Sequence, residues 1–114
     1  MAIAHLASGQ VRSILQLAAP PDTLQSIAIF KDAHLEVIRM VLPAAKVIPP
    51  HSVNGPITIQ CLAGEVVVTA DAQEHRLLAG DLQYFTGGVV HQLNAIQDSA
   101  LLVTIVLLAA ISKV

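Results

Sequence analysis

Short runs of apolar residues, separated by glycine, proline and polar residues, follow one another along most of the chain. The stretch from Glu65 to Asp71 shows the pattern: its even positions are all apolar, whereas its odd positions include Glu, Thr and Asp. A period of two is typical of a strand with one buried face. Because the runs are also rich in Val, Ile, Leu and Thr, they predict strands at Val11–Leu17, Leu24–Lys31, His34–Leu42, Ile57–Leu62, Glu65–Ala70, Arg76–Leu78, Leu82–Phe85, Val90–Ala95 and Ala100–Leu107.

Turn signals lie between these runs, at residues 71–74, 79–81 and 86–88. A helical period is conceivable only in residues 1–8 and 107–113. Strands spaced this tightly predict an all-β sandwich or barrel. The length of 114 residues, without a linker or an internal repeat, predicts one domain over residues 1–114.

The composition is unusually apolar, with 54% hydrophobic and only 12% charged residues, where soluble domains average about 25% charged. A filled barrel and a buried subunit interface would absorb this excess, so we expect a homodimer. A net charge of −2 and the absence of Trp give no basic or stacking surface for nucleic acid. The longest apolar stretch, Ala100–Ile111, is too short to span a membrane, and no leader pattern opens the chain. We therefore expect a cytoplasmic protein.

Two motifs suggest a family. The first runs from Pro50-His51 through Gly64-Glu65, and the second from Gly80-Asp81 through Gly88 to His91. Between Lys46 and Leu107 they resemble the paired motifs of cupins, in particular the small single-domain barrels of the cupin 2 type. The resemblance implies a double-stranded β-helix, or jelly-roll cupin barrel. It also implies dimerisation through an N-terminal strand, for which Val11–Leu17, within residues 1–20, is the candidate.

In cupins, three imidazoles and one carboxylate face into the barrel and hold a divalent transition metal. This sequence retains His51 and His91 but has Val53 in place of the third imidazole and Ile57 in place of the carboxylate. Aliphatic side chains cannot coordinate a metal, and two histidines fall short of the three protein ligands usual at a catalytic zinc. Two interpretations stay open: hydrogen-bonded remnants, or an open two-histidine site that binds Zn, Ni, Fe or Mn at low occupancy.

Other residues complete the candidate site. Strand alternation predicts that the ligand pocket is lined by Val53, Ile57, Ile59 and Leu93. Tyr84 is a further ligand-binding and catalytic candidate if its hydroxyl points inward, and a core aromatic otherwise. Arg39 either binds an anion in the pocket or faces outward, with Glu36 as a partner.

We do not expect the remaining cysteine and histidine residues to belong to the site. Cys61 lies about 13 Å beyond the lost carboxylate, since a strand rises about 3.3 Å per residue, and is interpreted as a small buried hydrophobe. We expect His75 to be solvated, His34 to sit in a turn and His5 to lie in a tail.

Three functions follow. The first is a homodimeric cupin that binds a small molecule in the barrel mouth, with or without a metal. The second is an enzyme, an isomerase, lyase or oxygenase, in which His51 and His91 hold a metal or act as acid and base. The third is a structural or regulatory module without an active site. The sequence does not distinguish a sugar, an organic acid or an aromatic ligand.

Overall fold

The computed structural model describes residues 5–14 and 26–108. Within these ranges the chain forms strands and turns but no helix, which confirms the all-β prediction. It follows that no helix there is long and apolar enough to cross a membrane. The strands of the described residues are β1 (Ile27–Lys31), β2 (Leu35–Leu42), β3 (Val47–His51), β4 (Ile57–Ala63), β5 (Glu65–Ala70), β6 (Gln73–Leu78), β7 (Leu82–Phe85), β8 (His91–Ala95) and β9 (Ser99–Val106).

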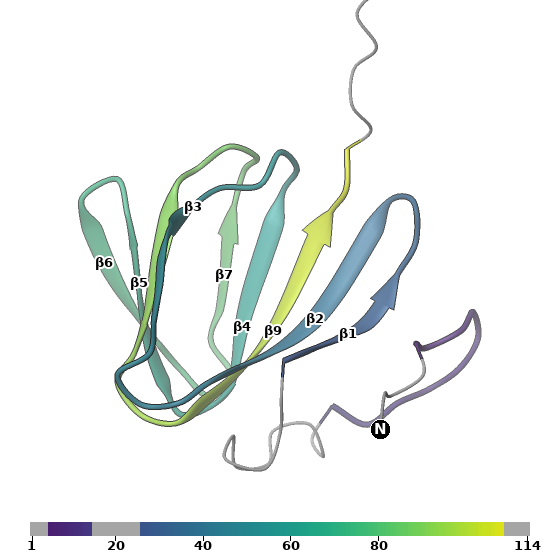
Figure 1. Cartoon of the computed structure of the whole chain (residues 1–114), viewed down its shortest axis with the longest axis horizontal. Coiled ribbons are helices and arrows are strands. Elements are labelled where there is room, and N and C mark those ends of the chain that lie inside the picture. The colour runs from purple at the N-terminus through teal and green to yellow at the C-terminus, as the bar shows by residue number, and fades with distance from the viewer. Residues whose placement is uncertain (1–4, 15–25, 109–114) are drawn as a thin grey trace, which may run out of the picture.

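The strands form two antiparallel sheets that face each other (Figure 1). The five-stranded sheet has the order β1-β2-β9-β4-β7, and the four-stranded sheet has the order β3-β8-β5-β6. Between β2 and β5 the chain passes from one sheet to the other at each connection. This connectivity is that of a jelly roll, as predicted.

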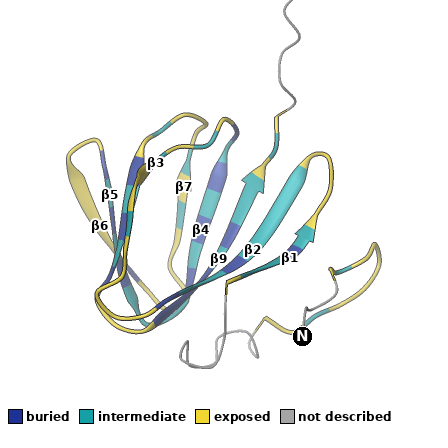
Figure 2. Ribbon diagram, in the orientation of Figure 1, coloured by how far each residue is buried: buried dark blue, intermediate teal, exposed yellow. Residues whose placement is uncertain are grey.

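In β4, β5 and β8, alternate residues are buried between the sheets, whereas β6 is mostly exposed (Figure 2). In β4, for example, Ile57, Ile59 and Cys61 are buried while Thr58 and Gln60 are half-buried on the opposite face. The period of two seen in the sequence is therefore the pleat of strands that bury one face. The core formed in this way consists of Leu42, Ile57, Ile59, Cys61, Val66, Val68, Leu77, Leu93, Ala95, Leu101 and Val103.

Strand β3 was not among the predicted strands because it contains Pro49 and Pro50. Proline lacks the N–H that a central strand needs, and it is tolerated at sheet edges and irregularities. β3 meets both conditions: it is an edge strand that pairs only with β8, and its register shifts between Ile48 and His51. The chain thus gains an edge strand that bears His51 at its end.

The strand predicted at Val11–Leu17 is wrong over the residues of it that the structure describes. Of the expected strand at residues 11–17, residues 11–14 form no strand, and residues 15–17 lie outside the described residues. Residues 5–8 and 107–108 are not helical. The rest of the two segments in which a helix was conceivable, residues 1–4 and 109–113, lies outside the described residues. The N-terminal segment is joined to the barrel by a hydrogen bond from the Leu6 N–H to the Ile29 carbonyl, at 2.8 Å.

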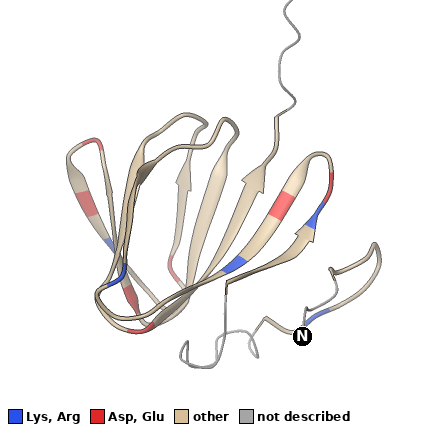
Figure 3. Cartoon of the chain, in the orientation of Figure 1, with Lys and Arg blue, Asp and Glu red and all other residues tan. Residues whose placement is uncertain are grey.

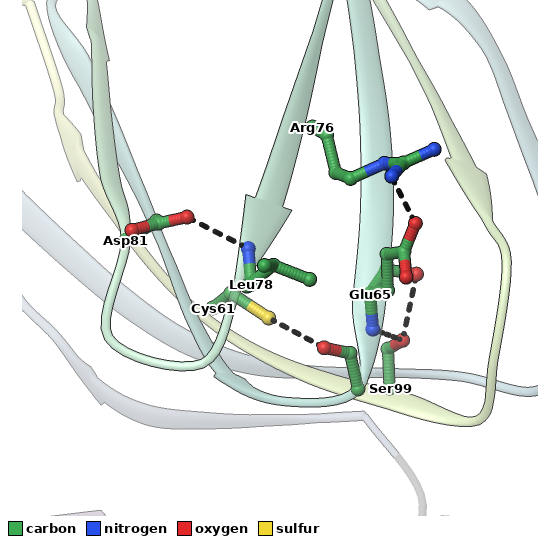
Figure 4. Close-up of polar contacts among 7 residues, drawn as sticks. Cys61, Glu65, Arg76, Leu78, Asp81 and Ser99 are labelled. Carbon is green, nitrogen blue, oxygen red and sulfur yellow. Dashed lines mark hydrogen bonds and ion pairs between the residues drawn. The ribbon is translucent and has the colours of Figure 1, made fainter.

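The closed end of the barrel is held by a buried hydroxyl (Figure 4). Ser99 is fully buried; its Oγ accepts the Glu65 N–H at 3.0 Å and donates to the Gln97 carbonyl at 2.8 Å. Its neighbour Cys61 is also fully buried, with Sγ 3.4 Å from the Ala63 carbonyl. The polar groups at this end are thus satisfied within the fold, as buried polar groups generally are.

The turn between β5 and β6 consists of Asp71 and Ala72, with Ala70 paired to Gln73. Both turn residues have positive φ, 52° and 60°. Two positive φ values define a type I′ hairpin turn, whose second position strongly prefers glycine. Ala72 therefore holds a conformation in which its Cβ is strained.

Replacing Ala72 by glycine should raise the free energy of unfolding by about 0.5–1 kcal/mol, because relief of the left-handed strain outweighs the added freedom of the unfolded chain. Urea denaturation would measure this change. Ala79→Gly is the matched control: Ala79 is also an exposed turn residue but has no positive φ, so its substitution should lower stability. Equal effects of the two substitutions would contradict the strain argument.

Candidate functional site

The candidate site lies at the end of the barrel opposite Ser99, which we call the mouth. Across the inner face of the five-stranded sheet, the strand register aligns Glu36, Ile105, Ile57 and Phe85 in one row. Across the inner face of the four-stranded sheet, the same level holds His51, His91, Ala70 and Gln73. The mouth therefore brings together residues from strands that are far apart in the sequence.

The structure places His51 and His91 side by side. They are direct partners in the β3–β8 register, and their ring centroids are 4.4 Å apart with the planes tilted by 53°. Phe85 of the opposite sheet stacks on His91 at 5.3 Å and 17°. His91 is 1% exposed, whereas His51 is half-buried. Only the His51 ring therefore presents substantial surface at the mouth.

Main-chain carbonyls fix the tautomer of both rings in their neutral form. His51 Nδ1 lies 3.1 Å from the Pro49 carbonyl oxygen, and His91 Nδ1 lies 3.0 Å from that of Val89. A carbonyl oxygen only accepts, so each Nδ1 must carry a proton, and in the neutral ring Nε2 then carries the lone pair. Each histidine thus offers Nε2 as its hydrogen-bond acceptor or metal-binding atom.

Burial lowers the pKa of His91 below its ordinary value. The Val89 carbonyl opposes this by stabilising the charged ring, while the neighbouring His51 lowers the pKa further. Loss of hydration is the largest of the three causes because the ring is enclosed between Phe85 and the core. His91 is therefore neutral at physiological pH.

The predicted apolar lining fills the barrel. Ile57, Ile59 and Leu93 are at most 4% exposed and belong to the core cluster, so they bury the inner end of the site and do not line an open space. Val53 lies in the β3–β4 loop, half-buried against the same core. The interior beneath the two histidines is thus packed with side chains.

Tyr84 does not point into the barrel. It pairs with Thr58 on the outer face of the five-stranded sheet and is 58% exposed, while its neighbour Phe85 faces inward. The pleat dictates this, since Tyr84 alternates with an inward residue. The phenol is therefore not a catalytic or ligand-binding group of the mouth.

Arg39 and Glu36 lie on opposite faces of β2, three positions apart, so the expected pairing between them is wrong. Arg39 is 1% exposed although it lies on the outer face, opposite Ile38 and Met40 of the core side. Its enclosure lowers the pKa of the guanidinium. Arg39 thus faces neither the mouth nor solvent.

The other singled-out groups lie away from the mouth. His5, His34 and His75 are exposed. Cys61 is at the closed end, where burial raises the pKa of its thiol. None of these four residues contributes a group to the histidine pair.

The donors present do not fit a cupin metal site. Val53 and Ile57 have no lone pairs, and in the described ranges no three His, Cys, Asp or Glu side chains come close enough to hold a metal ion together. Glu36 shares the row of Ile57 but stands two strands away, at about 5 Å per strand. A metal could bind here only through the two Nε2 atoms.

Two cavities lie at this end of the barrel, and His91 lines one of them. The mouth cavity, of about 300 Å³, is lined by Glu36, Ser52–Gly55 and Ile105–Leu108. The outer cavity, of about 220 Å³, is lined by Pro50, Thr69–Asp71 and Val90–Gln92. Glu36 was missed as a site residue, although it shares the even-numbered alternation of Ile38, Met40 and Leu42 that marks the inner face of β2.

Backbone contacts fix the loops around the mouth cavity. A Cβ on Gly55 would collide with the Val106 carbonyl, and a Cβ on Gly87 with the Asn54 carbonyl. The Gly88 N–H also donates to the Val53 carbonyl at 2.8 Å. The β3–β4 loop is thus clamped between the end of β9 and the β7–β8 loop by main-chain atoms.

The lowered pKa of His91 predicts a pH dependence of stability. As pH falls below about 6.5, the unfolded chain binds a proton on this ring before the folded chain does, so stability is lost until the folded pKa is reached. For one group the slope cannot exceed about 1.4 kcal/mol per pH unit. Urea unfolding between pH 7.5 and 5.5 should show this loss.

His91→Gln should flatten this pH profile, whereas His75→Gln, which changes an exposed histidine on β6, should leave it as in wild type. An unchanged slope in the His91 variant would show that another group is responsible.

Comparison with known proteins agrees with this geometry. The family model for the cupin domain matches residues 38–107, more than half of the chain. A conserved protein of unknown function from Streptococcus pyogenes has a similar structure, with a TM-score of 0.77 at 21% identity, covering 96% of this chain and 100% of that one.

A cupin superfamily protein from Desulfitobacterium hafniense gives a TM-score of 0.77 at 16% identity, covering 94% of this chain and 99% of that one. A predicted oxalate decarboxylase from Thermotoga maritima gives 0.65 at 23% identity, covering 73% and 79%. A search of curated protein sequences found no match. Likenesses at these identities show a shared fold, and the family match shows more: the chain belongs to the cupin family.

Proposed function

We propose that this cupin binds a small molecule at the mouth of its barrel through His51, with the buried His91 as its support and without a resident metal ion. The observation that carries the proposal is the state of the two rings. Both Nδ1 protons are held by main-chain carbonyls, so in the neutral ring of the half-buried His51 the lone pair lies on Nε2. Such an atom accepts a hydrogen bond from a hydroxyl or N–H of a ligand.

His91 contributes by being neutral and immobile. Its ring is enclosed by Phe85 and by His51, and its pKa is lowered by burial. A neutral, enclosed neighbour adds no charge to the mouth, so we expect hydrogen bonding and packing to govern ligand binding there. The apolar residues below the rings favour a ligand with an apolar part.

The enzymatic alternative has less support. A general acid–base pair needs both groups within hydrogen-bond reach of the substrate, and His91 is 1% exposed. Catalysis by a metal would need further ligands that Val53 and Ile57 do not supply. A module without any site is opposed by the half-buried His51, whose ring is held by a hydrogen bond to the Pro49 carbonyl.

A thermal-shift screen with small sugars, hydroxy acids and phenols tests the binding proposal. A ligand present at 100 times its Kd stabilises the folded state by about 2.7 kcal/mol, which raises the melting temperature by several degrees. We expect this shift to disappear in His51→Ala and to persist in the matched surface variant His75→Ala. Equal stabilisation of wild type and His51→Ala would show that the mouth is not the site.

Protein from the same preparations also tests whether a metal ion is bound. Protein purified without a metal-affinity column should contain sub-stoichiometric metal by elemental analysis, also after incubation with Zn, Ni, Fe(II) or Mn. Stoichiometric metal that is lost in His51→Ala would overturn the metal-free proposal and favour a metalloenzyme.

We also propose that the protein is a homodimer in which two copies pack the outer faces of their five-stranded sheets. β4, β7 and β9 form an uncharged strip on this face (Figure 3), where Leu82 is 63% exposed and Tyr84 58% exposed. The outer face of the four-stranded sheet instead carries the Arg76–Glu65 ion pair, at 2.8 Å. The strip consists of Thr58, Gln60, Leu62, Leu82, Tyr84, Leu102, Thr104 and Val106.

Sedimentation velocity between 1 and 200 μM should show a monomer–dimer equilibrium, because three strands bury less than the roughly 800 Å² per partner of a standard interface. Leu82→Lys and Tyr84→Lys should give monomers at all these concentrations. Ile96→Lys changes an equally apolar residue that is 47% exposed beyond the four-stranded sheet, and it should leave the dimer intact. A monomeric wild type would refute the proposal.

A further inference from the structure

We propose that the mouth cavity is a binding site for a small organic cation, a protonated primary or secondary amine with a short apolar body. The carboxylate of Glu36 is its counter-ion, and the side-chain oxygens of Ser52 and Asn54 accept its remaining N–H groups. This site lies beside the histidine pair but does not use it, so the inference goes beyond the function proposed above.

Glu36 is placed by the pleat on the inner face of β2. The register of β2 with β9 is continuous from Leu35 to Leu42, so Glu36 shares the face of Ile38, Met40 and Leu42, which pack on the core. It is half-buried and lines the mouth cavity. The apolar side chains on this face of β2 are thus followed by a carboxylate, which places a negative charge at the wall of the cavity.

No ion pair of the Glu36 carboxylate is found within residues 5–14 and 26–108. Arg76 pairs with Glu65, on the other sheet. Lys31 is the direct cross-strand partner of Glu36, but it is exposed and its ammonium group makes no ion pair with the carboxylate. Partial removal from water makes a charged group more costly without a partner, and a bound cation would supply that partner.

The other walls match an alkylammonium ion. Its N–H donors face three kinds of acceptor, the Glu36 carboxylate, the Ser52 hydroxyl and the Asn54 amide oxygen, and it has no acceptor of its own. Val53, Ile105 and Leu107 offer apolar contact for the carbon skeleton. A volume of about 300 Å³ lies at the lower end for small-molecule sites, so the body must be short.

The site is also preformed. The loop that carries Ser52 and Asn54 is clamped by the close backbone approaches at Gly55 and Gly87. A cavity held by main-chain contacts loses little conformational entropy when a ligand enters. The cavity thus has its shape before a ligand binds, and the negative charge of Glu36 favours a positively charged ligand.

An NMR titration with three probes of equal skeleton tests the proposal: isobutylamine hydrochloride, isobutanol and sodium isobutyrate, each up to 50 mM at pH 7.5. We expect saturable shifts of the backbone amides of Glu36, residues 52–55 and residues 105–107 with the amine. The alcohol should bind at least tenfold more weakly and the carboxylate not at all. Similar affinities for all three probes, or no binding of the amine, would overturn the proposal.

Variants separate charge from shape and this site from the histidine pair. Glu36→Gln keeps the size of the side chain and should weaken amine binding tenfold or more, the loss expected for a charge-assisted hydrogen bond. Lys31→Gln should keep or raise the affinity, because it removes a competing cation. His51→Ala should leave it unchanged, so failure here and failure of the histidine proposal are distinguishable.

A second variant guards against misfolding. Asn54→Ala removes one acceptor without touching β2 and should weaken the amine several-fold while leaving the dispersed spectrum of the folded barrel. Wild-type affinity in both Glu36→Gln and Asn54→Ala would refute the site even if the amine binds elsewhere on the protein.

Discussion

The burial of two sheet faces against each other governs every other feature of this protein. Once alternate residues of each strand are committed to the core, the orientation of all the rest is fixed by the pleat. Ile57, Ile59 and Cys61 are turned inward together, and the same rule puts His91 inside and Tyr84 outside. Strand register thus determines which side chains reach the mouth. The local sequence contributes through its alternation of apolar and polar residues.

The two histidines illustrate how a packed interior limits which ring atoms are available. Their Nδ1 protons are committed to the main chain and one ring is closed off from solvent, which leaves a single accessible acceptor at the rim. With aliphatic side chains at positions 53 and 57, desolvation outweighs charge as the dominant influence on His91. These features favour a hydrogen-bonding role for the pair, as proposed above, over a role as metal ligands.

Much of the fold was predictable because it depends on local patterns. Alternation located β5 and most of β2, β4 and β9, and glycine and polar turns located their ends. Strand β3 was not predictable in this way, since Pro49 and Pro50 are acceptable only at an edge with a register shift, and edges are defined by tertiary structure. In the site, the motifs identified His51 and His91. Glu36 escaped notice because its relation to the mouth arises from pairing with Ile105, about 70 residues away along the chain.

The backbone contacts at Gly55 and Gly87 have a consequence for how this barrel can change. The loops at the mouth are positioned by close main-chain contacts at Gly55 and Gly87, and the carbonyl and Cα atoms that meet these glycines are common to all amino acids. The exposed side chains at positions 52 and 54 can therefore be exchanged without altering the loop that presents them. A rim held in this way keeps its shape while its side chains change, so specificity at the mouth can change one residue at a time.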